Sequence, residues 1–239
     1  MNTNTSQSTE KPNVITGVLK RMFQIFGNLS VVAVILFAAS GRLGWVWAWV
    51  YVGVGAALLA VTALVILPTT PELVAERSRA AENTKGWDRV AVVLIFISVA
   101  GIFLVAGLDE RFGWSPGFPW AIHAAALVVT ILAQAVFTWA MASNRFFVKT
   151  VRIQEERGHI VASGGPYRFV RHPGYAANIV TMFAVSLLLG SLWALIPAAL
   201  SALAFIVRTA LEDKTLQREL DGYAGYARQV RYRLVPGIW

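Results

Sequence analysis

Long apolar runs, separated by short polar segments, dominate the sequence. Five such runs are present, and they span residues 26–39, 43–67, 90–108, 120–142 and 176–207. A helix needs about 20 residues to cross a bilayer, so the last run is too long for one helix and fits two short helices with a turn at Gly190-Ser191. We therefore predict an all-α, polytopic transmembrane helical bundle of about six spans, in which the first span and the last two are short and the last two form a hairpin.

The composition agrees with this pattern. Hydrophobic residues make up 56% of the 239 residues and charged residues only 14%, and the mean hydropathy is +0.59. A soluble domain needs a far more charged surface, so we predict an integral membrane protein. The chain has no cysteine, which excludes disulfides, thiolate metal ligands and a thiol nucleophile. No His, Asp and Glu cluster has the spacing of a metal site, so we expect no metal, and His123 in the fourth span is expected to be a packing residue.

The distribution of basic residues predicts the orientation of the spans. Of the 21 Lys and Arg residues, only Arg42 and Arg111 fall on one side of a six-span topology. Because basic loops stay in the cytoplasm, we expect a cytoplasmic membrane of the bacterial type, both termini cytoplasmic and an uncleaved first span. This topology accounts for the net charge of +8, and no recognition motif accompanies the charge, so we expect membrane lipid and no nucleic acid as a partner.

The chain divides into three predicted parts. Residues 1–13 are polar and are expected to form a disordered leader. Residues 14–142 form a four-span membrane part, and residues 143–239 a cofactor-binding and catalytic part with the transmembrane hairpin and a C-terminal amphipathic tail. Strands and helices do not alternate anywhere, so a Rossmann-type domain is excluded and a nucleotide-like cofactor must be held by loops and helix ends.

The segment 68–89, between the second and third spans, admits two interpretations. Thr70 and Pro71 are suited to the start of a short helix. Such a helix is often an interfacial linker with basic side chains toward lipid head groups, and this is the interpretation that we favour. The alternative is that the segment lines the mouth of a cofactor or substrate site.

Dense polar chemistry lies just before the predicted hairpin, as in a site reached from both water and lipid. The sequence Arg171-His172-Pro173 places a proline in the first helical turn and biases His172 toward extended backbone. Free backbone N–H groups at this helix mouth, with the guanidinium of Arg171, favour a carboxylate or phosphate, and Tyr167 and Tyr175 provide aromatic walls. The alternative is that Arg171 and His172 are ordinary interfacial anchors.

A second polar tract follows the hairpin. Arg208 and Glu212 are four residues apart and share one face of a helix, whereas Asp213 points off that face and is the weaker candidate. An Arg and a Glu at the edge of the hydrocarbon are costly unless they are paired or used in a site, and the alternative is a surface ion pair. Further on, Tyr223 and Tyr226 could close over a bound cofactor, while the arginines that follow could rest on anionic lipid.

Together the two tracts resemble the isoprenylcysteine carboxyl methyltransferase family of membrane methyltransferases, which also looks akin to phospholipid N-methyltransferases. The resemblance covers the C-terminal part of the chain, and it is specific through the order and spacing of its elements around the hairpin. The first four spans match only in being apolar. The matching residues are His159-Ile160-Val161, Gly165-Pro166-Tyr167, Arg171-His172-Pro173-Gly174-Tyr175, Arg208, Glu212-Asp213, Tyr223, Tyr226 and Val235-Pro236.

The resemblance implies S-adenosyl-L-methionine as the cofactor, bound in a cytoplasmic pocket, and a lipophilic small-molecule or lipidated acceptor that enters from the bilayer. It makes Arg208 and Glu212 the catalytic residues, with Arg208 near the methyl acceptor. The family's paired glutamates are Glu212-Asp213 here, which keeps the charge, and Ala176-Ala177 replace a frequent glycine. By the resemblance, His159, Val161, Gly165, Tyr167, His172, Pro173, Tyr175 and Glu212 would bind the cofactor, and the charge and aromatic arguments above add Arg171, Tyr223 and Tyr226.

The residues themselves are compatible with this chemistry. Methyl transfer from a sulfonium is an in-line displacement that needs little acid–base help, so positioning and exclusion of water supply much of the rate. If the acceptor is a carboxylate, Arg208 could orient it. If the acceptor is an amine or a thiol, Arg208 is expected only to hold Glu212.

Two other classes remain open. A membrane reductase of the sterol or steroid type resembles this chain in an Arg-His-Pro-x-Tyr element and a tyrosine-rich tail, and it would bind NADPH. A non-catalytic lipid-binding or scaffold protein is the other class. A protein of that class would have no need for the charged residues at the edge of the spans or for the ordered motif.

Overall fold

A computed structural model of the protein describes residues 14–78 and 84–239. Within these ranges the chain is helical and has no strand, and the predicted leader at residues 1–13 lies outside them. Five of the described helices are long and apolar enough to cross a membrane, and a further apolar helix has 16 residues. In chain order the helices are α1 (Val14–Ser40), α2 (Val46–Ile66), α3 (Pro71–Glu76), α4 (Gly86–Phe112), α5 (Trp120–Ala142), α6 (Pro173–Leu188), α7 (Leu195–Glu219) and α8 (Tyr223–Gln229), with short 3-10 turns at Glu155–Arg157 and Gly165–Arg168.

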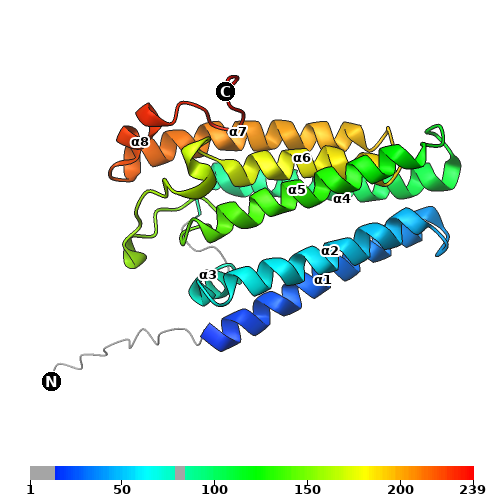
Figure 1. The fold of residues 1–239 in the computed structure, drawn as a ribbon, viewed down its shortest axis with the longest axis horizontal. Coiled ribbons are helices and arrows are strands. Elements are labelled where there is room, and N and C mark those ends of the chain that lie inside the picture. Colours follow the sequence, from blue (N-terminus) through cyan, green and yellow to red (C-terminus); the bar gives the residue numbers. More distant parts are fainter. Residues whose placement is uncertain (1–13, 79–83) are drawn as a thin grey trace.

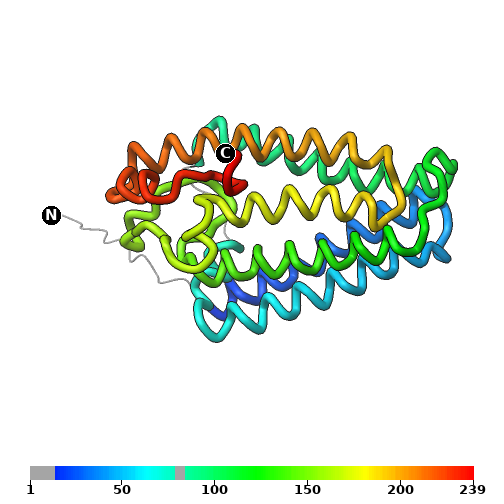
Figure 2. Tube along the Cα trace, turned by 45° about the horizontal axis from the view of Figure 1, so that its top comes forward, coloured from blue at the N-terminus to red at the C-terminus, as the bar shows by residue number. Residues whose placement is uncertain are grey.

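The long helices lie side by side in one elongated bundle (Figure 1). The pair α1 and α2 lies along one side of the bundle, where α1 contacts α4, while α5 packs along α6 and α4 along α7. Both views place α3, α8 and the loop 143–172 together at one end, which we call the loop end (Figure 2). The turns α1–α2, α4–α5 and α6–α7 lie at the other end, which we call the turn end.

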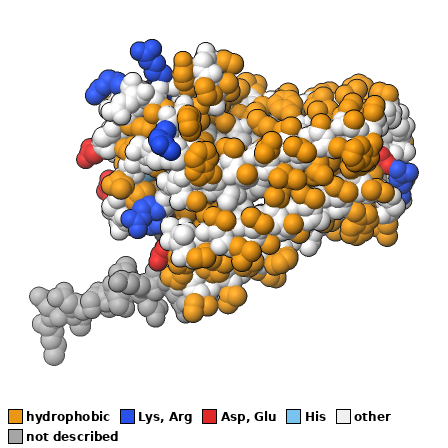
Figure 3. Space-filling model, in the orientation of Figure 1, with side chains coloured by type: hydrophobic (Ala, Val, Ile, Leu, Met, Phe, Trp, Pro, Cys, Tyr) orange, Lys and Arg blue, Asp and Glu red, His pale blue; other side chains and the backbone are white. Residues whose placement is uncertain are grey.

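The surface between the two ends is apolar. Figure 3 shows Lys, Arg, Asp and Glu side chains gathered at the ends of the visible face, with hydrophobic side chains between them. Arg42 and Arg111, which the sequence sets apart from the other basic residues, both lie at the turn end. Arg42 follows α1 and forms an ion pair with Glu110, and Arg111 lies in the last turn of α4. The apolar belt and the helical fold confirm a polytopic integral membrane protein.

The last two spans form the predicted hairpin. α6 ends at Leu188, and Gly190 has a φ of +78°, a left-handed conformation that glycine adopts without the steric cost of a side chain. The predicted lengths are correct only for α6. α1 has 27 residues and α7 has 25, so the prediction of short spans is wrong for both. Their backbone hydrogen bonding continues beyond the apolar runs into polar flanks, because a helix does not need apolar side chains to propagate.

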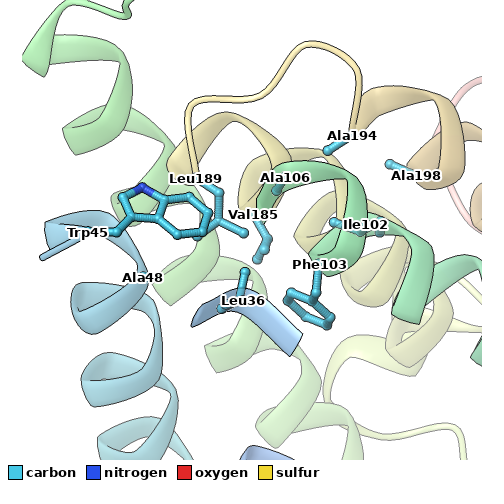
Figure 4. Packing of buried hydrophobic residues seen from close by; sticks show 10 residues of the cluster. All are labelled: Leu36, Trp45, Ala48, Ile102, Phe103, Ala106, Val185, Leu189, Ala194 and Ala198. Atoms are coloured by element: carbon cyan, nitrogen blue, oxygen red, sulfur yellow. The ribbon is translucent and has the colours of Figure 1, made fainter. Parts of the chain in front are cut away.

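A cluster of buried side chains joins the helices at the turn end (Figure 4). Leu36 of α1, Phe103 of α4 and Val185 of α6 belong to this cluster. Gly107 lets α1 and α4 approach each other, because a Cβ at this position would lie 2.6 Å from the Cβ of Ala39. Small residues permit such close crossings in membranes. The bundle is thus packed tightly at the end opposite the loops.

Buried polar groups fasten the turns at this end. The carboxylate of Asp109 accepts hydrogen bonds from the backbone N–H and the hydroxyl of Ser115, at 2.7 and 2.5 Å, and from the hydroxyl of Ser191 at 2.5 Å. His123 Nδ1 donates to the carbonyl oxygen of Leu188 at 2.8 Å. His123 therefore has the packing role that the sequence predicts, and the α6–α7 turn is held against α4 and α5.

Candidate active site

A pocket of about 380 Å³ lies at the loop end of the bundle. This volume is within the range of roughly 300–1,000 Å³ that is typical of sites for small organic ligands. The pocket walls come from α4, α5, the loop 143–172, α6, α7 and α8, which are far apart in the sequence. Aromatic rings and a small number of charged groups line the polar part, and aliphatic side chains line the rest.

At the mouth of α6, His172 has the non-helical backbone that a following proline favours, but it is not fully extended as predicted. His172 precedes the helix with φ of −128° and ψ of 60°, and the next residue, a proline, begins α6. The backbone N–H groups of Arg171 and His172 donate to the carbonyl oxygens of Tyr232 and Arg233, each at 2.9 Å. These bonds fasten the C-terminal segment to the corner. The N–H of Gly174, which lines the pocket, has no acceptor within the described ranges.

The buried carboxylate of Asp213 joins this corner to α7 and to the tail. It accepts hydrogen bonds from Nε and Nη2 of Arg171 at 2.7 and 3.0 Å, from Nε of Arg233 at 3.0 Å and from the hydroxyl of Tyr223 at 3.0 Å. Its side chain is fully buried and does not line the pocket. Asp213, the weaker ligand candidate in the sequence, is therefore a structural hub.

The guanidinium of Arg171 is largely committed to this hub. Besides the two bonds to Asp213, its Nη1 donates to the carbonyl oxygens of Val230 and Arg231 at 2.7 and 2.8 Å. A guanidinium has five N–H groups, so one remains for a ligand. The sequence predicts that this guanidinium binds a carboxylate or phosphate. In the structure Arg171 lines the pocket, but most of its N–H groups hold the C-terminal segment in place.

Arg208 is paired with an acid from another helix. Its Nε donates to Oδ1 of Asp88, in the first turn of α4, at 2.7 Å, and its Nη2 donates to the carbonyl oxygen of Lys149 at 2.6 Å. Asp88 is fully buried, and its Oδ2 accepts the backbone N–H of Val151 at 2.8 Å. The expectation that Arg208 holds Glu212 is therefore wrong. The guanidinium forms its ion pair with Asp88 instead, and this pair fixes its orientation.

Glu212 instead accepts a hydrogen bond from the hydroxyl of Tyr175 at 2.5 Å. The Tyr175 ring stacks on the imidazole of His172, with centroids 5.7 Å apart and an interplanar angle of 3°. The guanidinium of Arg208 lies 5.1 Å from the Tyr175 centroid. All four residues line the pocket. No Lys or Arg in the described part of the chain pairs with Glu212, so its carboxylate is suited to a positively charged ligand group.

His159 lies against the ring of Phe146, with centroids 4.5 Å apart. Its Nδ1 accepts the backbone N–H of Gln154 at 3.3 Å, which leaves the proton on Nε2. Burial, together with the positive charges of Arg157 and Arg152, lowers the pKa of His159 to about 4. The imidazole at the pocket wall is therefore neutral at physiological pH and can donate one hydrogen bond to a ligand.

This shift predicts a pH dependence of stability. Since the folded pKa of His159 lies below the ordinary value of 6.5, the folded state binds fewer protons than the unfolded state between these two values. The contribution of this group is thus fully present above pH 6.5 and is lost as the pH falls toward 4. We expect His159→Gln to flatten the fall in unfolding temperature over this window, measured by differential scanning fluorimetry in detergent. An unchanged slope would contradict the assignment.

Three tyrosines form the aromatic part of the wall. The hydroxyl of Tyr226 donates to the carbonyl oxygen of Tyr167 at 2.7 Å, and the hydroxyl of Tyr167 accepts from Asn144 at 3.3 Å. Tyr223 donates to Asp213. Burial raises the pKa of all three phenols, which remain neutral. Because their hydroxyl groups bind the protein, their rings are held in fixed positions at the pocket.

The structure brings most of the predicted site residues to this pocket, but Gly165 and Pro173 do not line it. Gly165 has a φ of +57°, and a Cβ there would lie 2.2 Å from the hydroxyl oxygen of Ser143, so this glycine is needed for the turn. Pro173 begins α6. The predicted residues that line the pocket are Arg208, Glu212, His159, Val161, Tyr167, Arg171, His172, Tyr175, Tyr223 and Tyr226.

The sequence interpretation missed two residues of the segment 68–89. Arg77, which follows α3, lines the pocket, and Asp88 holds Arg208. The favoured interpretation of this segment as an interfacial linker is therefore wrong for these residues, and the alternative, that the segment lines a site, is correct for Arg77. A signal for Asp88 was present, because an acid beside an apolar run is costly unless it has a partner. Other lining residues that the sequence did not single out are Asn144, Lys149, Arg152 and Asn178.

The fold and the pocket together define a class: a helical integral membrane protein with a pocket of mixed apolar and polar lining at one end of its spans. Residues 125–218, from α5 to the end of α7, match the model of the isoprenylcysteine carboxyl methyltransferase (ICMT) family. Among solved structures, the chain is similar to the eukaryotic intramembrane Ras methyltransferase ICMT. The TM-score is 0.51 at 16% identity, over 95% of this chain and 87% of that chain. The search of curated proteins gave no match.

These comparisons confirm the resemblance to the ICMT family. The family match places it in the same C-terminal part of the chain that carries the two polar tracts. At this low identity the structural likeness shows the fold, and it extends the ICMT-like polytopic arrangement to nearly the whole chain. The two findings support an ICMT-like polytopic membrane fold, with the family match confined to residues 125–218.

Proposed function

We propose that this protein transfers the methyl group of S-adenosyl-L-methionine to a lipophilic acceptor that reaches the pocket from the bilayer. The observation that carries the proposal is the placement of Tyr175, Arg208 and Glu212 around one pocket, at the end of an apolar hairpin and within the region that matches the ICMT family. Polar groups at the edge of the hydrocarbon are expected where a site serves both a water-soluble and a lipid-soluble ligand.

The pocket residues fit the chemical groups of this cofactor. The carboxylate of Glu212 forms no ion pair within the described ranges and suits an ammonium group. The free N–H of Gly174 suits a carboxylate, and the neutral His159 offers one further donor. The ring faces of Tyr167 and Tyr223 suit a purine or a sulfonium.

The chemistry requires little of the protein beyond positioning. When bound, the cofactor supplies an electrophilic methyl group on a sulfonium, which an acceptor displaces in line. Asp88 and the carbonyl oxygen of Lys149 hold the guanidinium of Arg208 in one orientation, so it can orient an acceptor that carries a carboxylate. The aromatic wall would limit the access of water to the same space once the ligands are bound, and both effects lower the barrier to group transfer.

The other wall of the pocket provides a path for an apolar acceptor. Val92, Ile95 and Phe96 of α4 line the pocket, and so does Phe205 of α7. Phe96 is 70% exposed, which means that this wall continues to the lipid-facing surface of the bundle. We infer that the acceptor enters here, along α4, without passing through water.

We further infer that the pocket faces the cytoplasm of a bacterial-type membrane, with both termini on that side. The start of α1 and helix α8 lie at the loop end of the bundle, together with the pocket (Figure 1). The described basic residues other than Arg42 and Arg111 belong to the segments of this end, and such segments remain in the cytoplasm.

Calorimetric titration of the purified protein with S-adenosylhomocysteine and, separately, with NADPH tests the cofactor assignment. We expect S-adenosylhomocysteine to bind and NADPH to give no heat. Binding of NADPH alone would replace the proposal with a reductase of the sterol type. Binding of neither compound to a folded sample would favour a non-catalytic lipid-binding protein.

A further inference from the structure

Three basic residues gather where the N-terminal helices meet the pocket. Arg77 follows α3, and Lys149 lies in the loop after α5; both line the pocket. Arg21 lies on α1, and its charge acts on both of them. Burial and Arg21 lower the pKa of Arg77 to about 10, and desolvation at the pocket mouth, with Arg21 and Arg77, lowers the pKa of Lys149 to about 8. Arg77 and Lys149 therefore face one pocket with like charges, and the charge of Arg21 adds to theirs.

Close packing of α1 against the α3 segment holds Arg21 in this position. A Cβ at Gly17 would lie 2.6 Å from the Cβ of Ala75, and the side-chain amide of Gln24 donates to the carbonyl oxygen of Ser78 at 3.2 Å. Residues 17, 21 and 24 are spaced four and three apart, so they share one face of the helix. Arg21 therefore faces the same segment that carries Arg77.

The pocket wall beside this cluster is fixed by two arginines. Arg77 donates from Nη1 to the carbonyl oxygen of Phe147 at 2.9 Å and lies over the Phe147 ring, 5.3 Å from its centroid. Arg208 donates to the carbonyl oxygen of Lys149 at 2.6 Å. The segment 147–149 is held between them. Arg77 uses one N–H in this contact and keeps others for a ligand in the pocket.

These cations differ from the other buried arginines of the site. Arg208 is paired with Asp88, and Arg171 with Asp213. By contrast, no carboxylate of the described residues pairs with Arg21, Arg77 or Lys149. The side-chain acceptors are an amide oxygen for Arg21, at 3.3 Å, and the Phe147 carbonyl oxygen for Arg77. Like charges held together without a counter-charge are unfavourable, and a bound anion would relieve the repulsion.

We propose that Arg77 and Lys149, with the charge of Arg21 beside them, bind the phosphate of an amphiphile whose apolar chain lies along the α4 wall. A phosphate monoester carries about −1.5 to −2 charges at neutral pH, which suits three cations better than a carboxylate does. The α4 wall, Arg77 and Lys149 line the same pocket. The inference rests on the proposed function in one respect, since it names a phosphate-bearing amphiphile as the acceptor class.

Titration calorimetry with dodecyl phosphate in a neutral detergent tests the site. We expect Arg77→Gln and Lys149→Gln each to weaken binding about tenfold, the value of one charge-assisted hydrogen bond. Arg77→Lys should retain most of the affinity. Arg228→Gln, in the exposed part of α8 and away from the pocket, is the matched control and should bind like the wild type. Lys149→Gln keeps the test valid if Arg77→Gln does not fold, because the Lys149 side chain makes no hydrogen bond within the described ranges.

Three results would overturn the proposal. The first is equal affinity of the wild type and both Gln variants for dodecyl phosphate. The second is equally tight binding of dodecanol, which has the chain without the anion. The third is equally tight binding of inorganic phosphate, which would make the ligand a water-soluble phosphate. S-adenosylhomocysteine is titrated in parallel: if it does not bind the wild type while dodecyl phosphate does, the proposed function fails and the anion site remains.

Discussion

Replacement of Glu212 by Gln is expected to weaken the binding of S-adenosylhomocysteine about 10- to 100-fold, because the carboxylate supplies a charge-assisted hydrogen bond to the ligand ammonium. The amide has the same shape and can still accept the hydroxyl hydrogen bond of Tyr175. The fold should therefore persist in detergent. Calorimetry gives the affinity, and the unfolding temperature reports on the fold.

Glu219→Gln is the matched control for this experiment. Glu219 is on the same helix, but its carboxylate pairs with Lys85 at the surface, 2.6 Å away, and does not line the pocket. We expect this variant to bind S-adenosylhomocysteine like the wild type. Wild-type affinity in Glu212→Gln, with a folded protein, would remove Glu212 from the site.

Asp88→Asn is expected to lower the methyl-transfer kcat about 100-fold while S-adenosylhomocysteine affinity changes little. Asp88 holds the Arg208 guanidinium through Nε at 2.7 Å, so its loss frees the side chain that faces the acceptor. Removing one partner of a buried ion pair also costs about 3–5 kcal/mol of folding stability. Steady-state kinetics separates kcat from KM, and chemical denaturation gives the stability.

The double variant Asp88→Asn with Arg208→Gln distinguishes a positioning role from a purely structural one. It removes the uncompensated buried charge, so it should recover part of the lost stability without recovering kcat. Asp221→Asn, at an exposed position between α7 and α8, is the control and should leave both quantities unchanged. If kcat returns with stability, Asp88 serves only the fold.

Much of the fold could be predicted because the membrane imposes a length and a polarity on each span. The hairpin turn at Gly190 and the non-helical corner at His172 follow from local rules, since glycine permits the left-handed conformation and proline restricts the residue before it. The lengths of α1 and α7 could not be predicted in this way. Hydropathy predicts which part of a helix lies in the lipid. The helix itself continues until its backbone hydrogen bonding stops, which hydropathy does not show.

Sequence reasoning places residues at the pocket where they are close together in the chain and misses partners from distant segments, while their roles in binding and catalysis stay predictions. The motif from His159 to Tyr175 and the pair Arg208 and Glu212 all lead to the pocket, with Gly165 and Pro173 as supports. The spacing of four residues suggests that Arg208 binds Glu212, but in the structure Arg208 binds Asp88, which lies on another helix. Helical spacing defines which side chains share a face and cannot show what the neighbouring helix presents.

The most direct test of the central claim is the transfer of a deuterated methyl group from labelled S-adenosylmethionine. The protein, in lipid nanodiscs, is given three acceptors in turn: an S-prenylated cysteine, an aminophospholipid and a long-chain thiol, which offer a carboxylate, an amine next to a phosphate, and a sulfur. Mass spectrometry of the organic extract measures the label. We expect a labelled product with the wild type, and none with Glu212→Gln. No label in any acceptor with a folded wild-type protein would contradict methyl transfer to a lipophilic substrate.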